Sequence, residues 1–323
     1  MNDAFLKHLE EIRSSTNRAL RQLPLSAKPV YLYGPVQYIL EGEGKRLRPI
    51  LVHLSGEAFG ANAEDLVNAS LAVELLHNFT LVHDDIMDHD DTRHGKPTVH
   101  FKWDESTAIL AGDGLYAIGQ LCISKLSTGQ LEAVRAFNQA TLMVCEGQAF
   151  DKEFEENDAI SLDDYFTMIE KKTGWLLGLC AELGAILGRK DLAVREALRA
   201  YGLNLGKTFQ IQDDLLEIYS DSHQMGKSLG SDVLAGKQTV LTILARDQWK
   251  EEWISLNQSL KNKPVAQKLE QLRTFFDRRG IHSRAQEYAR EFSRKALATL
   301  KVIPDEKRKA LELFTDYVLN RKK

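Results

Sequence analysis

No proline occurs between Pro97 and Pro264, a stretch that covers about half of the 323-residue chain. Proline inside a helix removes a backbone hydrogen bond and clashes with the preceding turn, so this stretch favours a series of long helices. Apolar residues also recur at helical spacing rather than in alternation, first at Phe5, Leu9, Ile12, Leu20 and Leu23. We therefore predict one all-α domain over residues 1–323, with a helical hairpin at its N-terminus and a helical addition at its C-terminus.

Two short sequences are predicted to separate helices. Gly34-Pro35-Val36 and Asn262-Lys263-Pro264 both contain residues that favour turns or end helices. Three further helical stretches are expected after Pro264. Asp113-Gly114 is also typical of a turn, but no alternating strands flank it, so no β-hairpin is predicted there.

The charge balance excludes one broad class of function. The chain has 42 basic and 46 acidic residues and a net charge of −4, whereas a general nucleic-acid-binding protein would be basic. A local cluster of basic residues can still bind a small anionic substrate in such a protein.

The cysteines and the N-terminus predict a cytoplasmic protein. Cys122, Cys145 and Cys180 are odd in number and match no metal-binding or disulfide pattern, which favours reduced thiols. Residues 1–15 lack the apolar core of a signal peptide. No run of about 18 apolar residues was found, and we expect no stable membrane insertion.

The first of two acidic clusters interrupts an apolar helical run that begins near Leu71. It contains Asp84, Asp85 and Asp88. Because a helix turns about 100° per residue, one face of this helix carries, in order, His77, Thr80, Asp84 and Asp88. A lone acidic run is usually a solvated surface. Like charges four residues apart destabilise a helix, however, and a divalent cation is the simplest way to compensate them here.

The second acidic cluster repeats this spacing inside another apolar run, at Asp213, Asp214 and Glu217. If the two helices face each other, six carboxylates converge on one cavity. Magnesium prefers oxygen ligands and usually takes one or two carboxylates, completing its shell with water and substrate phosphate. The pair of clusters therefore predicts a magnesium-dependent enzyme with a phosphorylated substrate.

Basic residues accompany the interrupted helices at four further places. They are Lys45, Arg46 and Arg48 before Pro49, Arg93 and His94 after the first acidic cluster, Lys171 and Lys172 before Thr173, and Lys227 and Lys237 after the second. Each alone would be an ordinary surface charge. Together they favour phosphate binding, for which arginine offers a planar fork and lysine a mobile point charge. Their number suggests two phosphorylated substrates.

These motifs closely resemble those of the trans-isoprenyl diphosphate synthases, also called polyprenyl synthetases. The resemblance runs from Gly44 to Thr239 and rests on GKRLRP, Glu74 and His77 before DDIMD, GKPT, GQAFD, KTG, FQIQDDLLE and the paired GK sequences after it. It implies an all-α bundle with a central active-site cavity, a homodimer, and three magnesium ions per active site. It also implies condensation of isopentenyl diphosphate with an allylic diphosphate through an allylic carbocation.

The resemblance assigns roles to individual residues. The positions that match contacts to isopentenyl diphosphate are Lys45, Arg48 and His77. The magnesium ligands are Asp84, Asp85, Asp88, Asp213, Asp214 and Glu217. The cations that match contacts to the allylic diphosphate are Arg93, Lys172, Lys227 and Lys237. Thr173 and Gln210, with Lys172, match catalytic positions around the carbocation, and Gln148 and Asp151 match a polar pair that lines the cavity.

Three positions depart from the family pattern. His94 stands where the family usually has a second arginine that helps bind isopentenyl diphosphate, so we expect weaker binding of that substrate. Glu217 replaces an aspartate but remains an oxygen ligand. Glu43 replaces a glycine before Gly44.

The segment before the first acidic cluster bears on product length. Phe79 lies five residues before Asp84, and the motif lacks a two-residue insertion, which resembles geranylgeranyl diphosphate synthases. Thr80 lies about 6 Å further down the helix than Asp84, on the same face. Without the motif, Phe79 would be ordinary core packing. We expect a C20 product, with C15 the next candidate.

Three other interpretations are open. A terpene cyclase or head-to-head prenyl synthase also uses acidic clusters and magnesium, but does not need the second diphosphate site at Lys45, Arg48 and His77. A di-iron bundle would use Glu74 and His77 as Glu-x-x-His, but the required second copy is missing. An inactive partner subunit should have lost motif residues, whereas both acidic clusters are present.

Overall fold

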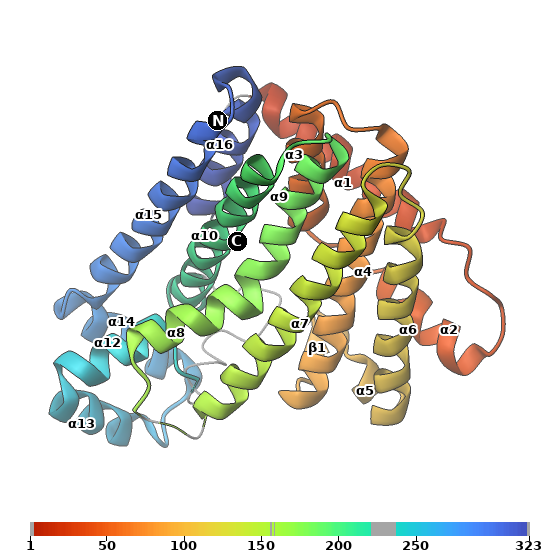
Figure 1. The fold of residues 1–323 in the computed structure, drawn as a ribbon. Helices are drawn as coiled ribbons and strands as arrows, with labels where there is room; N and C mark the ends of the chain where they lie inside the picture. The colour runs from red at the N-terminus through yellow and green to blue at the C-terminus, as the bar shows by residue number, and fades with distance from the viewer. Residues whose placement is uncertain (1–2, 156, 158, 221–236, 322–323) are drawn as a thin grey trace.

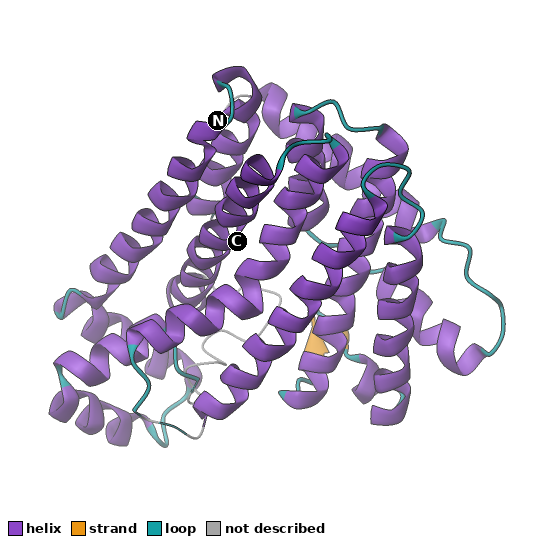
Figure 2. Cartoon of the chain, in the orientation of Figure 1, coloured by secondary structure: helices purple, strands orange, loops and turns teal. Residues whose placement is uncertain are grey.

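Helices form nearly all of the computed structural model, which describes residues 3–155, 157, 159–220 and 237–321 (Figures 1 and 2). In chain order the helices are α1 (Asp3–Arg21), α2 (Val30–Leu40), α3 (Leu47–Ala58), α4 (Ala63–Met87), α5 (Val99–Lys102), α6 (Glu105–Ile123), α7 (Gln130–Glu155), α8 (Leu162–Ile169), the π-helix η1 (Glu170–Gly174), α9 (Trp175–Leu187), α10 (Leu192–Tyr219), α12 (Val240–Gln248), α13 (Lys250–Leu260), α14 (Val265–Arg278), α15 (Ile281–Thr299), the 3-10 helix η2 (Leu300–Val302) and α16 (Asp305–Leu319). The all-α prediction is confirmed.

The long helices pack side by side around α9 and α10 (Figure 1). α9 packs against both α3 and α10, and every residue from Leu176 to Leu187 is buried, which explains why this helix is apolar except for Glu182, which pairs with Arg199. α10 contributes Leu205 to one apolar core cluster and Ile211 to a second cluster built with α12, α14 and α15. Because one helix enters both clusters, we propose that residues 1–323 form one domain.

One of the two predicted breaks between helices is wrong. Pro35 lies inside α2, which begins directly after Pro29. The backbone hydrogen bond that Pro35 cannot donate is offset by the burial of Pro35 and Val36. The break at Pro264 is confirmed, and α14, α15 and α16 are the three helical stretches expected after it. Asp113-Gly114 lies within α6, so the absence of a hairpin there is also confirmed.

A hairpin does occur at a place where none was predicted. Strands β1 (Thr92–Arg93) and β2 (Lys96–Pro97) pair antiparallel, with His94 and Gly95 at the turn. Both turn residues have positive φ, 50° and 73°, as a two-residue type I′ turn requires. Strands of two residues are too short to show an alternating apolar pattern. The hairpin carries Arg93 and His94 back toward the end of α4.

α6 is long and apolar enough to resemble a membrane-spanning helix, although Glu105 and Asp113 interrupt its apolar residues. It packs against α4 and α2, and 44% of its apolar window is buried inside the protein. We therefore describe α6 as a core helix.

Candidate active site

One cavity of about 960 Å³ brings together most of the residues singled out in the sequence. They are Lys45, Arg48, His77, Phe79, Thr80, Asp84, Asp88, Arg93, His94, Gln148, Lys172, Thr173, Gln210, Asp213, Asp214, Glu217 and Lys237. Asp85 and Asp151 do not line it, and Lys227 lies outside the described residues.

The ends of α4 and α10 both present carboxylates to this cavity. Asp84 lies in the last turn of α4, and Asp88 is the residue at its C-terminal cap. Burial opposes the ionisation of Asp88, but Lys237 Nζ lies 2.9 Å from its Oδ2 atom and lowers the pKa of the carboxyl. Burial raises the pKa of Asp84. Five of the six predicted carboxylates therefore converge, as the repeated spacing predicted.

Asp85 is the carboxylate that does not converge. Its side chain is buried, and Arg93 Nε donates a hydrogen bond of 2.6 Å to its Oδ1 atom. Asp85 lies one residue, about 100°, around the helix from Asp84, so it faces the β1–β2 hairpin instead of the cavity. In this structure Asp85 orients Arg93, and its predicted role as a magnesium ligand stays a prediction.

Two residues that the sequence reading missed hold the second acidic cluster. Arg321 Nη2 lies 2.5 Å from Asp213 Oδ1, and the Tyr165 hydroxyl donates a hydrogen bond of 2.6 Å to Asp214 Oδ2. Burial and the Asp214 charge raise the pKa of Tyr165 well above its ordinary value, so this hydroxyl stays a donor. Tyr165 lies 49 residues from Asp214, and no local pattern links the two.

The three cations of the GKRLRP segment lie in two different environments, one buried and two at the cavity. Arg46 turns inward at φ 51°, forms a buried ion pair with Glu74, and donates a 2.7 Å hydrogen bond from Nε to Asn17 Oδ1. Lys45 and Arg48, on either side of it, line the cavity. Only two of the three cations are thus placed to contact a substrate. Because Glu74 is paired with Arg46 and does not line the cavity, the di-iron interpretation is wrong.

His77 and Arg48 form a pair in the wall of the cavity. Arg48 Nη1 lies 3.0 Å from His77 Nε2. Burial, reinforced by the charges of Arg48 and Arg93, holds the pKa of His77 well below its ordinary value. His77 is therefore neutral, its Nε2 atom accepts from Arg48, and its Nδ1 atom carries the proton.

The π-helix η1 places Lys172 and Thr173. A side chain at Gly147 of α7 would lie 2.2 Å from Lys172 N, and one at Gly206 of α10 would lie 2.3 Å from the Cα atom of Gly174. Glycine at these two positions lets both helices approach the widened turn, a feature common at functional sites. The sequence showed an interruption at Lys171-Lys172-Thr173-Gly174 but not its π geometry.

The polar side chains of η1 are held by neighbouring helices. Lys172 Nζ lies 2.5 Å from Asp151 Oδ2, and Thr173 Oγ1 donates a 3.0 Å hydrogen bond to Gln210 Oε1. Burial opposes the charge of Lys172, but Asp151 and Asp84 outweigh it and raise the pKa, so the ammonium group stays protonated. Asp151, predicted as a cavity-lining residue, does not line the cavity and pairs with Lys172 instead.

Three cavity-lining side chains have buried polar atoms without a hydrogen-bond partner among the described residues. They are Arg48 Nε, Asp88 Oδ1 and Gln148 Oε1. Buried polar groups are normally paired, so Arg48 Nε favours an anion nearby. Asp88 Oδ1 lies 3.7 Å from Lys152 Nζ, beyond hydrogen-bond distance, and can take a closer cation or water. No three His, Cys, Asp or Glu side chains of the described chain are close enough to hold a metal ion by themselves. This donor set fits magnesium that takes further oxygen ligands from a diphosphate and water.

The same cavity continues along apolar side chains. Leu81, Val144, Leu176 and Phe209 line it together with Phe79, whose ring packs edge-on against His83 at 4.7 Å between ring centres. A ligand with a charged head and a hydrocarbon tail fits this division.

Comparisons with known proteins identify the family of this chain. The family model described as polyprenyl synthetase matches residues 29–275. Over 310 residues the chain is 40% identical to a geranylgeranyl pyrophosphate synthase of Geoglobus acetivorans, covering 94% of this chain and 95% of that protein. It is 35% identical over 336 residues to a geranylfarnesyl diphosphate synthase of Natronomonas pharaonis, covering 97% and 96%. The crystal structure of a geranylgeranyl pyrophosphate synthetase from Pyrococcus horikoshii matches with a TM-score of 0.90 and 31% identity, covering 99% of each chain. The chain belongs to the polyprenyl synthetase family.

Proposed function

We propose that this polyprenyl synthetase condenses isopentenyl diphosphate with a short allylic diphosphate, and that its main product is C20, with C15 the next candidate. The observation that carries the proposal is the composition of one cavity. Carboxylates of α4 and α10 share this cavity with lysines and arginines from six segments of the chain, and apolar side chains line the rest of it. Relatives include geranylgeranyl and geranylfarnesyl diphosphate synthases, so the product length is the finer part of the proposal.

Different side chains of the cavity bind the two diphosphates. Arg93, Lys172 and Lys237 hold the allylic diphosphate, and their charges stabilise it as the carbon–oxygen bond breaks and the electron pair leaves with the phosphate. Bound magnesium, three ions by this proposal, would supply Lewis-acid stabilisation of the same leaving group, with Asp84, Asp88 and the α10 carboxylates as its protein ligands.

The second diphosphate is held at the other end of the charged region. Lys45, Arg48 and the neutral His77 bind isopentenyl diphosphate, so that its double bond can attack the allylic carbocation. Thr173 Oγ1 and Gln210 Oε1, which contact each other, place oxygen atoms near the cation. The released diphosphate then takes up the proton lost from the new chain.

Product analysis tests the proposal directly. The purified chain is incubated with magnesium, isopentenyl diphosphate and each of the C5, C10 and C15 allylic diphosphates in turn, and the products are sized. We expect elongation to C20 in every case that gives turnover. A hydrocarbon formed from the allylic diphosphate alone would favour a cyclase. Absence of any product would favour an inactive partner subunit.

We expect Phe79→Ala to lengthen the product. Removing the ring opens the apolar part of the cavity below Thr80, so the chain can grow by at least one further C5 unit before it meets the wall. Phe150→Ala is a matched control, because Phe150 packs against Phe154 and does not line the cavity. Product sizing that gives the same length for Phe79→Ala and the native chain would remove Phe79 from the account.

We expect His94→Arg to lower the KM for isopentenyl diphosphate by about fivefold, because a guanidinium group adds a charged hydrogen bond at this end of the cavity. His94 has φ 50°, a conformation that Arg46 also adopts, so the backbone accepts the change. Steady-state kinetics with the allylic substrate saturating measure the effect. An unchanged or higher KM would refute it.

We also propose that the protein is a cytoplasmic homodimer. α6 and α7 pack together and expose Ile109, Leu110, Leu121, Leu131 and Leu142. Two copies of this chain could cover these side chains by a symmetric contact. Sedimentation equilibrium should give twice the chain mass of 36.5 kDa, and a monomer at micromolar concentration would contradict the proposal. The cytoplasmic location is proposed because Cys122, Cys145 and Cys180 match no disulfide pattern.

A further inference from the structure

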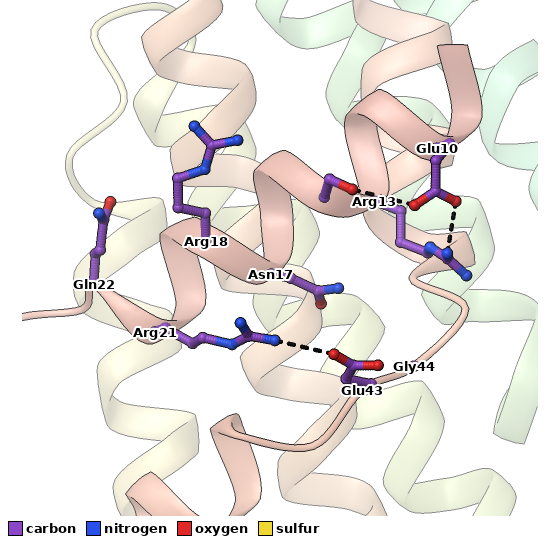
Figure 3. Close-up of a pocket in the computed structure, with 9 residues that line it drawn as sticks. Glu10, Arg13, Asn17, Arg18, Arg21, Gln22, Glu43 and Gly44 are labelled. Carbon is purple, nitrogen blue, oxygen red and sulfur yellow. Dashed lines mark hydrogen bonds and ion pairs between the residues drawn. The ribbon is translucent and has the colours of Figure 1, made fainter. Parts of the chain in front are cut away.

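A second cavity adjoins the active-site cavity along α1. It has a volume of about 520 Å³ and is lined by three arginines of α1, Arg13, Arg18 and Arg21 (Figure 3). Arg13 also lines the active-site cavity, as do Glu43 and Gly44. Because Gly44 directly precedes Lys45, the two cavities meet at the end where Lys45 and Arg48 are placed to bind isopentenyl diphosphate.

This end of the active-site cavity has few positive charges for a diphosphate. Lys45 and Arg48 are cations, whereas His77 is neutral because of its burial. His94 lines the same cavity with a ring that is shorter than an arginine side chain. Glu43, which also lines the cavity, adds a negative charge near the site. A diphosphate bound here needs further positive charge.

We propose that Arg13 is a further binding residue for isopentenyl diphosphate. The inference rests on the proposed function and extends it to α1, where no motif pointed. Arg13 of α1 would then be the third cation at this end of the cavity, beside Lys45 and Arg48.

The contacts of Arg13 suit this role. Arg13 Nη2 lies 2.6 Å from Glu10 Oε2, and both side chains are about half exposed. Water screens such a pair, so its guanidinium group can exchange Glu10 for a more highly charged diphosphate. Arg21 Nη2 lies 3.3 Å from Glu43 Oε1 (Figure 3), and water screens this exposed pair as well, so Glu43 is not neutralised.

Kinetics of matched arginine variants test the proposal. Arg13→Gln is expected to raise the KM for isopentenyl diphosphate by about tenfold, because it removes one partly exposed, charged hydrogen bond to that substrate. The KM for the allylic diphosphate should change by less than about twofold. Arg18→Gln is the control, because Arg18 lies on the same helix and lines only the second cavity. Arg13→Lys should fall between the native chain and Arg13→Gln. In a His94→Arg background the effect of Arg13→Gln should shrink, because the new guanidinium group competes for the same phosphate oxygens.

Calorimetric titration of isopentenyl diphosphate into the same variants separates this inference from the proposed function. Weaker binding by Arg13→Gln, with Arg18→Gln unchanged, supports the inference even if the chain proves to have no turnover. Equal binding by the native chain and Arg13→Gln, an equal loss in both variants, or no binding by the native chain overturns it. An active native enzyme with an unchanged KM in Arg13→Gln overturns the inference and leaves the proposed function intact.

Discussion

Asp84→Asn should lower kcat by about a thousandfold, the scale expected when one of the groups that stabilise transition-state charge is removed. Asp84 lies one helical turn before Asp88 and lines the cavity opposite the carboxylates of α10. The amide keeps the shape of the side chain but loses its negative charge, so a magnesium ion between protein and diphosphate is held less tightly. Steady-state rates over a range of magnesium concentrations should also show a higher requirement for the metal.

The stability of this variant provides a folding control. Burial raises the pKa of Asp84, so its folded-state pKa lies above the unfolded one. The stabilising contribution of such a carboxyl group is present below the unfolded pKa and is lost as the pH rises through the folded pKa. Above its folded-state pKa the ionised Asp84 therefore costs stability when metal is removed. Metal-free Asp84→Asn should melt no lower than the native chain.

Two neighbouring aspartates distinguish metal binding from a general charge effect. Asp91 is exposed and does not line the cavity, so Asp91→Asn should leave kcat unchanged. Asp85 is buried against Arg93, so Asp85→Asn should act mainly on the KM for the allylic diphosphate. A comparable loss of kcat in Asp84→Asn and Asp91→Asn, or an unchanged kcat in Asp84→Asn, would contradict this account of the acidic cluster.

Glu74→Ala should lower the free energy of unfolding by about 3–5 kcal/mol, the usual cost of removing one partner from a buried ion pair. The side chains of Arg46 and Glu74 are only 6% and 5% exposed. Without Glu74 the Arg46 guanidinium group stays buried, with Asn17 Oδ1 and the Gly42 carbonyl as its remaining acceptors. Urea denaturation followed by circular dichroism measures the loss.

Two further variants show whether the ion pair causes this loss. Arg46→Met combined with Glu74→Leu removes both charges and should recover much of the stability, because an apolar pair has no charge to bury. Glu291→Ala breaks an exposed pair with Lys295 and should change stability little. A loss in the double variant as large as that in Glu74→Ala would assign the effect to packing instead of charge.

The Arg46–Glu74 ion pair is also expected to affect substrate binding. Arg46 is the residue at the N-terminal cap of α3, between Lys45 and Arg48. Anchoring Arg46 inside the protein turns its neighbours toward the cavity. The fraction of the Glu74→Ala variant that remains folded should therefore bind isopentenyl diphosphate more weakly than the native chain does.

The helical spacing of residues predicted much of the fold and which side chains share one face of α4 at the site. A turn of about 100° per residue placed His77, Thr80, Asp84 and Asp88 on one face, and all four line the cavity. A turn of about 100° per residue also places Asp85 on another face, but the family motif led to its prediction as a magnesium ligand together with Asp84. Spacing describes one helix at a time, so it shows which residues share a face and not what that face meets.

Contacts between distant segments could not be predicted from the sequence. Tyr165 and Arg321 support Asp214 and Asp213 from α8 and from beyond α16, and neither belongs to a recognisable motif. Arg13 is one arginine among three on an amphipathic helix, and only packing brings it to the cavity. The π-helix η1 depends on the close approach of Gly147 and Gly206, which are ordinary helical glycines in the sequence.

The central claim is that the ends of α4 and α10 share metal ions around an allylic diphosphate. Anomalous diffraction from crystals grown with manganese and a non-ionisable allylic diphosphate analogue tests this claim most directly. We predict manganese peaks within coordination distance of Asp84 or Asp88 on one side and of Asp213, Asp214 or Glu217 on the other, with diphosphate oxygens between them. Peaks elsewhere, or an analogue bound away from both helices, would contradict it.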